Sequence, residues 1–312
     1  MHEVPEPSHT RTDSPPLLDV SPAALDDHLG SAPFAVRHHV GPGHPLLTRE
    51  ALITRAADWP SRLSRHRDGN VPLVMPTRSA ERLGEDAADA AAVMRDIDRN
   101  SCWLVLWELE RSPRYSQFLD ECLDPVDVLV GTREGGMTDR GMNVLASSPD
   151  AVVPAHFDMH HNFLLQIDGT KEVTVGSFSD PRVNERALDR FYDDGNNNAP
   201  ALPDVASTFR LGPGDGVYIP PFGFHWVRGG PETSISISCG FRTLATERAN
   251  LVHECNARLR RLGLHPRPPG TSVYHDRAKV ELLAWVRRTR RATGPVLTKV
   301  RNRVRRAATL RS

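Results

Sequence analysis

Three residues supply the clearest chemistry in this sequence: His156, Asp158 and, much later in the chain, His225. Two imidazoles and one carboxylate are the ligand set with which non-haem Fe(II) oxygenases hold iron on one face and leave the opposite positions open. Residues two apart in a strand point to the same side, so His156 and Asp158 can bind one metal ion inside a barrel. In a chain with 14 histidines, a chance or surface His-x-Asp triplet is the alternative.

The segment that contains His225 favours the metal site. Residues 214–215 read as a turn, residues 217–219 as a strand, and Pro220-Pro221 as a rigid approach to His225. Such a strand can return a third ligand to the same face of a barrel. We therefore predict that the three residues bind one metal ion, with a vestigial site that has lost its metal as the alternative.

Lys171 indicates a second ligand of the same site. It follows the turn at Asp168-Gly169-Thr170, so an antiparallel strand would bring it back near the metal. An inward-facing lysine is costly unless it meets an anion. A dicarboxylate that chelates iron at one end and meets Lys171 at the other would satisfy this requirement. An ordinary exposed lysine beside Glu172 is the alternative.

The elements that must position these residues are short strands. From 128 to 243, apolar runs alternate with Gly, Pro, Asp and Asn clusters, a pattern typical of a barrel or sandwich. The clearest strands are 162–167, 172–176, 216–219 and 234–238. Before them, Thr48 can cap a helix that runs through Ala57, residues 79–97 have a helical period, and residues 101–108 read as a buried strand.

Composition limits the class of protein. At 312 residues with 39% hydrophobic residues, the chain can bury a sizeable core, and no apolar run approaches the roughly 18 residues of a membrane span. The first residues are polar and lack a signal-peptide core, so a cytoplasmic location is expected. Cysteines at 102, 122, 239 and 255 form no Cys-x-x-Cys pair, so we expect buried free thiols.

The C-terminal tail is strongly basic. From Asp276 to Ser312 there are twelve Lys or Arg and two acids, so this segment carries +10 and the rest of the chain −10. Apolar residues recur with a helical period in 278–291 and again around 296–304. The simpler interpretation is a pair of helices that docks on the body or forms a homodimer, with solvated arginines. A weak contact with a polyanion is the alternative.

The stretch from Pro154 to Lys171 resembles the core motif of the JmjC and cupin-like 2-oxoglutarate oxygenases. It is most similar to the branch that contains the asparaginyl hydroxylase of the hypoxia response. That pattern is His-x-Asp followed by Asn, Gln-Ile, Gly and Lys at these offsets, then Gly-Asp, Ile-Pro and the distal His. The resemblance covers residues 101–243. It implies a mainly β protein with a double-stranded β-helix (jelly-roll or cupin) core and helical N- and C-terminal extensions.

The resemblance also implies a role for each matched residue. His156, Asp158 and His225 would be the iron ligands, and Lys171 would bind the distal carboxylate of 2-oxoglutarate. Asn162 would hydrogen-bond the cosubstrate or order the ligand shell, unless it merely ends a strand.

Two positions near this motif differ from the hypoxia-response enzyme, and a third has two possible roles. Val153 stands where the hypoxia-response enzyme has a hydroxyl residue that helps to hold the cosubstrate. Gly240 stands where that enzyme has Asn, which could leave room beside the metal. Arg242 is either a further anion contact or a charge at a strand end.

The expected organisation has four parts. Residues 1–30 are a loosely ordered lead-in, 31–127 a mixed α/β region that packs on the barrel, 128–245 the JmjC-like β-helix, and 246–312 basic helices. Within the barrel, His160 and His161 could add ligands or contact the substrate, and the alternative is that they are polar residues at the pocket edge or the surface. The Asp- and Asn-rich run 193–198 lacks the ligand spacing of an EF-hand loop and is expected to be a flexible insertion between barrel strands, which could form a lid over the substrate.

These features predict an Fe(II)- and 2-oxoglutarate-dependent dioxygenase. It would use O2 to hydroxylate an unactivated C–H bond in a peptide or protein side chain or an amino-acid-like metabolite, with release of succinate and CO2. One alternative is a natural-product tailoring oxygenase that hydroxylates or desaturates a small molecule. Another is a non-catalytic metal-binding cupin, and a third is an interaction protein that acts through its basic tail.

Overall fold

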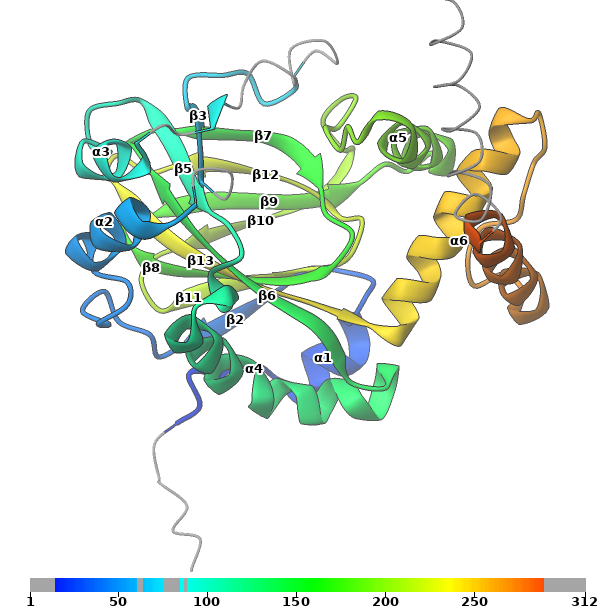
Figure 1. The fold of residues 1–312 in the computed structure, drawn as a ribbon, viewed down its shortest axis with the longest axis horizontal. Coiled ribbons are helices and arrows are strands. Elements are labelled where there is room, and N and C mark those ends of the chain that lie inside the picture. The colour runs from blue at the N-terminus through cyan, green and yellow to red at the C-terminus, as the bar shows by residue number, and fades with distance from the viewer. Residues whose placement is uncertain (1–14, 61–63, 76–84, 87–88, 289–312) are drawn as a thin grey trace, which may run out of the picture.

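Two antiparallel β-sheets face each other in the computed structural model, which describes residues 15–60, 64–75, 85–86 and 89–288 (Figure 1). The larger sheet has the order β1-β2-β11-β8-β13-β6-β5-β3-β4, and the smaller has the order β10-β9-β12-β7. The strands of the larger sheet are β1 (Leu18–Asp19), β2 (Phe34–His38), β3 (Ser64–Asp68), β4 (Glu85–Asp86), β5 (Cys102–Leu106), β6 (Met137–Ser147), β8 (His161–Asp168), β11 (Asp215–Ile219) and β13 (Ser234–Thr243). Those of the smaller sheet are β7 (Val152–Phe157), β9 (Lys171–Ser177), β10 (Val205–Leu211) and β12 (Phe224–Gly229).

Helices flank these sheets. The named helices are α1 (Pro22–His28), α2 (Arg49–Asp58), α3 (Ala90–Arg95), the 3-10 turn Leu109–Arg111, α4 (Pro113–Glu134), α5 (Pro181–Asp194) and α6 (Leu244–Arg261). A further helix spans 273–288. In Figure 1, α4 and α1 lie under the larger sheet, whereas α5, α6 and the last helix gather at one side of the molecule.

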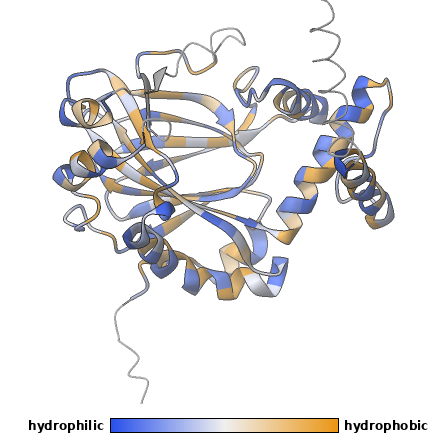
Figure 2. Cartoon of the chain, viewed as in Figure 1, coloured by the Kyte–Doolittle hydropathy of each residue, from blue (hydrophilic) through white to orange (hydrophobic). Residues whose placement is uncertain are grey.

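Apolar residues are buried on both sides of the larger sheet. One cluster lies between the two sheets and includes Leu164, Val173, Val217 and Val227. The outer cluster lies between α4 and the larger sheet. The buried side chains of α4 recur every three or four residues from Tyr115 to Val130. Hydrophobic and hydrophilic residues accordingly alternate along this helix (Figure 2). Apolar packing thus holds the two sheets together and attaches α4 to the larger sheet.

Several predicted elements are confirmed. All four of the strands named from the pattern are present, and the run 101–108 forms β5, which is fully buried. The Thr48 side chain accepts a hydrogen bond from the Ala51 backbone and caps α2 as predicted. The four cysteines are buried and free. The mainly β, cupin-like fold class is therefore confirmed.

Other expectations differ from the structure. The helix predicted at 79–97 is confined, among the described residues, to α3, because β4 occupies 85–86. The helix α5 was not expected, although Asp180 caps it, Pro181 begins it and Gly195 ends it in the left-handed conformation. Strands β2 and β5 pair directly with the barrel strands β11 and β6, and β3 pairs with β5, so the N-terminal region forms part of the larger sheet as well as packing on it.

One predicted boundary and the tail also bear on the expected organisation. The boundary proposed at 127–128 falls inside α4, which continues to Glu134. The last predicted helix, around 296–304, lies outside the described residues, so the homodimer and the polyanion contact stay predictions. No helix in the described part of the chain has both the length and the apolar character to cross a bilayer.

Candidate functional site

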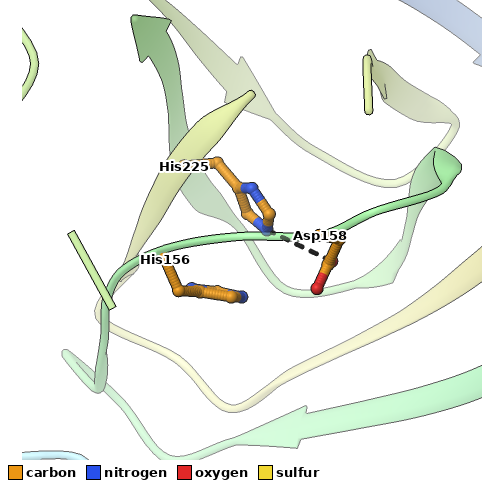
Figure 3. A group of neighbouring side chains, drawn as sticks. All are labelled: His156, Asp158 and His225. Carbon is orange, nitrogen blue, oxygen red and sulfur yellow. Dashed lines mark ion pairs between the residues drawn. The ribbon is translucent and has the colours of Figure 1, made fainter. Parts of the chain in front are cut away.

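His156, Asp158 and His225 converge on one point between the sheets. His156 lies on β7, Asp158 follows the end of that strand, and His225 lies on the paired strand β12, directly opposite His156. One ligand atom from each lies within 4.8 Å of the others, so a single ion could contact all three. Figure 3 shows the three side chains directed into the same space. Cross-strand pairing therefore joins two segments that are distant in sequence.

Backbone carbonyls fix the orientation of both imidazoles. The Nδ1 atom of His156 lies 2.8 Å from the Pro154 carbonyl oxygen, and Nδ1 of His225 lies 3.0 Å from the Gly223 carbonyl oxygen. A carbonyl can only accept, so each Nδ1 carries the hydrogen and each Nε2 keeps its lone pair for a metal. Metal-binding histidines are commonly held in this way. The donor set and its tautomers therefore fit a divalent metal ion such as Fe(II).

The protonation states agree with this fit. Burial would raise the pKa of Asp158, but the neighbouring imidazoles of His160, His225 and His156 together lower it, so the carboxylate is ionised. Burial, together with the nearby His156, lowers the pKa of His225 to about 4, which keeps this imidazole neutral. Neutral imidazole and ionised carboxylate are the forms that bind a metal ion.

A cavity of about 290 Å³ surrounds the triad. Its walls come from both sheets and from two loops. One wall is the inner face of β5, where Trp103 and Val105 alternate with buried outward-facing residues and Trp107 continues the same row beyond the end of the strand. The Trp107 backbone carbonyl accepts a 2.9 Å hydrogen bond from the Trp59 indole, and its side chain is 40% exposed. Trp107 therefore stands at the edge of the cavity, where a substrate could contact it.

Lys171 lines the same cavity, as predicted. It is the first residue of β9 and is only 5% exposed. Burial lowers the pKa of its ammonium to about 8. Among the described residues, no hydrogen bond or ion pair is made by this side chain. A buried cation without a protein partner is unfavourable, so the cavity has the character of an anion-binding site at this end.

Asn162 is 5% exposed and also lines the cavity. Ser238 on the neighbouring strand donates a 2.9 Å hydrogen bond to its Oδ1, which fixes the amide so that Nδ2 can donate to another group. Val153 lines the cavity as an apolar residue, and Ser147 is a hydroxyl on the opposite sheet that lines it too. Asn162 is thus an oriented donor rather than a strand end at the surface.

Loop 195–199 approaches the site from outside the smaller sheet. Asn198 forms a β-bridge with His156, and the Asn197 side chain donates a 2.8 Å hydrogen bond to the Phe157 carbonyl. Both asparagines line the cavity. The run predicted to be an insertion over the substrate therefore pairs with the edge of β7, beside the metal ligands.

The two neighbouring histidines have different surroundings. His161 is fully buried on the outer face of the sheet, where its Nδ1 lies 2.6 Å from the Tyr218 hydroxyl. His160 lines the cavity, and Gly240 lies directly beneath its ring. The room expected at Gly240 is therefore filled by His160. Arg242 pairs with Asp139 at 2.8 Å and is not a lining residue of the cavity, which favours a strand-end charge.

Gly240→Ala is expected to destabilise the protein through a clash with His160. A Cβ atom at position 240 would lie 2.9 Å from Cδ2 and 3.2 Å from Nε2 of His160, closer than van der Waals contact allows. Overpacking of this kind costs about 1–3 kcal/mol in the free energy of unfolding. Urea denaturation of Gly240→Ala, His160→Ala and the double variant forms a cycle that measures the coupling. Equal costs of Gly240→Ala with and without His160 would show that the clash is not the cause.

Comparison with known proteins identifies the domain. Residues 132–249 match the family described as the JmjC domain. This segment contains β6 to β13 and with them the triad, Asn162 and Lys171. The predicted resemblance is thus confirmed over this segment, which forms the cupin-like β core. The triad within it has the ligand set of non-haem Fe(II) oxygenases.

Solved structures of the ribosomal oxygenase YcfD from Escherichia coli are similar to the chain. The complex with cobalt and 2-oxoglutarate has 18% identity and a TM-score of 0.45, and the complex with cobalt and succinic acid has 17% and 0.46. An X-ray structure of E. coli ycfD has 19% and 0.46. The alignments cover 85%, 85% and 86% of this chain but only 65%, 65% and 67% of those chains, so it spans about two thirds of their length. No curated protein sequence has a significant match.

Proposed function

We propose that this protein is an Fe(II)- and 2-oxoglutarate-dependent dioxygenase that hydroxylates an unactivated C–H bond. The substrate class is a peptide or protein side chain or an amino-acid-like metabolite, and succinate and CO2 are released. One observation carries the proposal: the metal-binding triad, an oriented amide and a buried lysine that has no partner among the described residues line one cavity.

His156, Asp158 and His225 would hold the iron. When bound, iron and 2-oxoglutarate supply the oxidising chemistry, which lies in the cofactors rather than in protein side chains. The ionised Asp158 offsets part of the positive charge of the metal. The two imidazoles keep their lone pairs directed at the site because their Nδ1–H groups are bound to backbone carbonyls.

Lys171 and Asn162 would orient the cosubstrate. The ammonium of Lys171 would pair with the distal carboxylate of 2-oxoglutarate, where low solvent exposure makes the charge-assisted hydrogen bond strong. The Asn162 amide, held by Ser238, would donate to an oxygen of the cosubstrate or of the ligand shell. With Val153 apolar, we propose Ser147 as the hydroxyl that compensates, because it lines the same cavity from β6.

The remaining walls would exclude water and orient the substrate. Trp103, Val105 and Leu145 form an apolar surface on the larger sheet, and Trp107 continues it to the cavity edge. Drug-sized ligands fill pockets of about 300–1,000 Å³. At about 290 Å³, this cavity must hold 2-oxoglutarate as well, so it has room for one side chain or a comparably small group of the substrate. A substrate larger than an amino acid must therefore extend out past Trp107.

A substrate screen tests this proposal. The purified protein is incubated with Fe(II), 2-oxoglutarate, O2 and sets of peptides or amino acids, while succinate and product mass are measured. We expect succinate formation that depends on one substrate and a product heavier by one oxygen atom. A product that has lost hydrogen would instead indicate a desaturating tailoring oxygenase. If the protein bound metal but released no succinate, either with a substrate or without one, a non-catalytic cupin would be favoured.

A further inference from the structure

Two short loops lie next to the ligands of the candidate metal site. The first follows β7 and contains Asp158 and Met159, and the second, 220–223, precedes β12 and His225. The backbone N–H of Phe222 donates a 2.7 Å hydrogen bond to the Asp158 carbonyl. The carbonyl of the next residue, Gly223, accepts from Nδ1 of His225 at 3.0 Å. A single loop is therefore bonded to both Asp158 and His225, and its position affects the separation of these two ligands.

The conformation of this loop is unfavourable by itself. Phe222 has φ +63°, in the left-handed region that a bulky aromatic residue rarely occupies. Such a conformation costs about 1–3 kcal/mol and persists only where surrounding contacts hold it. The ring of Phe222 packs against the His253 ring of α6, with centroids 4.7 Å apart and an angle of 59° between the planes. Helix α6 thus contacts the strained residue directly.

The same helix holds the other loop. The Asn250 side-chain amide donates a 3.1 Å hydrogen bond to the carbonyl of Met159, the residue after Asp158. The carbonyl of Asn250 accepts a 3.0 Å hydrogen bond from the hydroxyl of Tyr192 on α5. One helical turn of α6 therefore contacts both ligand-bearing loops, Asn250 at the first and His253 at the second.

Helix α6 is itself well anchored. Its first turn has a capping box between Thr243 and Thr246, and Arg260 in its last turn makes a two-pronged ion pair with Asp189 on α5. The Asn256 amide donates a 3.0 Å hydrogen bond to the Arg267 carbonyl, which ties α6 to the following segment. In Figure 1, α6 leaves the end of β13 and lies against α5. Because both ends of α6 are fixed, the helix can hold the two loops in place.

We propose that Asn250 and His253 are positioning residues that set the separation of Asp158 and His225 by holding the two loops from behind. The inference rests on the proposed function, since it concerns the metal site of that function. Neither residue is a metal ligand, and both lie on α6, which does not carry any residue of the triad. Their loss is therefore expected to lower metal affinity without removing a donor atom.

Cobalt binding tests this inference without turnover. Co(II) is titrated into the purified full chain, without 2-oxoglutarate, and followed by calorimetry and by its visible absorption. For Asn250→Ala we expect roughly 10- to 100-fold weaker Co(II) binding, the usual effect of losing a partner that orients a ligand. His253→Ala should act similarly, whereas His253→Phe, which retains an aromatic ring against Phe222, should restore most of the affinity.

Asn256→Ala is the matched control. It removes one amide-to-carbonyl hydrogen bond from the same helix, at almost the same length, but that bond leads to Arg267 and not to a ligand loop. We expect it to lower the melting temperature at least as much as Asn250→Ala, yet to leave Co(II) affinity unchanged. Equal affinities for Asn250→Ala and wild type, or equal losses for Asn250→Ala and Asn256→Ala, would overturn the inference. Absence of Co(II) binding by the wild type would instead overturn the proposed metal site, and the inference with it.

Discussion

Replacing Asp158 with Ala is expected to abolish substrate-dependent succinate formation and to weaken Co(II) binding by more than about 100-fold. Loss of an indirect partner already costs 10- to 100-fold in metal affinity, so loss of a direct donor should cost more. The variant also removes the only carboxylate of the triad, which leaves two imidazoles to bind a divalent cation. Calorimetric titration with Co(II) and a succinate assay measure the two effects.

Asp68→Ala is the control for this change. Asp68 is a second carboxylate among the described residues that line the cavity, but it is exposed and accepts a hydrogen bond from the Asn70 backbone. Its loss should leave Co(II) affinity within a few-fold of wild type. If Asp158→Ala bound Co(II) as tightly as Asp68→Ala, the triad would not be the metal site.

Lys171→Met should have opposite effects on ligand binding and on stability. A hydrogen bond to a charged group contributes about 1.5–3 kcal/mol, so 2-oxoglutarate should bind roughly 10- to 100-fold more weakly. The ligand-free variant should unfold at a higher temperature than wild type, because a buried cation without a protein partner is replaced by an apolar chain of similar length. Calorimetry with Co(II) present and thermal denaturation without ligand measure these quantities.

Arg228→Met provides the comparison for Lys171→Met. Arg228 is an exposed cation on β12 that lies at the outer groove bordered by Lys171, so its loss changes the net charge equally. We expect little change in either 2-oxoglutarate affinity or melting temperature. Similar losses of affinity in both variants would mean that long-range charge, and not a contact with Lys171, governs cosubstrate binding.

The pKa of Lys171 gives this effect a pH dependence. Burial lowers the pKa from 10.5 to about 8, so between these values the unfolded chain binds more protons than the folded protein. The free energy of unfolding of the ligand-free protein should therefore rise with pH from about 8 toward 10.5, with the full penalty present below 8. The affinity for 2-oxoglutarate should fall over the same range, since the ammonium is lost. The difference between wild type and Lys171→Met isolates this contribution from other titrating groups.

The ligand strands could be predicted because their signals are local. His156 and Asp158 follow the two-residue period of a strand, and the turn at 168–170 fixes where Lys171 begins the next one. The cavity wall had a comparable signal: Trp103 and Trp107 alternate along one face of the predicted strand 101–108, although sequence alone did not say which face was inward.

The features that the sequence did not predict depend mostly on tertiary contacts. Nothing local indicates that the His160 ring would occupy the space above Gly240, because His160 lies in the loop before β8 and Gly240 lies on β13. Helix α5 did carry a readable signal in Asp180-Pro181 and Gly195, but the polar run after it obscured the pattern. Asn250 meets Met159, and His253 meets Phe222, only through the path of α6 beside the barrel. Residues of this kind follow from packing, which spacing does not encode.

The order of strands in the larger sheet has a consequence for dissecting this protein. Within the segment that matches the JmjC domain, β11 pairs on its outer side with β2, and β6 pairs with β5. A fragment cut to residues 132–249 would therefore expose two open strand edges, together with the apolar face that α4 covers. Exposed edges invite pairing with other chains. The matched segment and the N-terminal strands thus share one sheet, and insolubility of such a fragment would reflect its exposed edges and not a defect in the metal site.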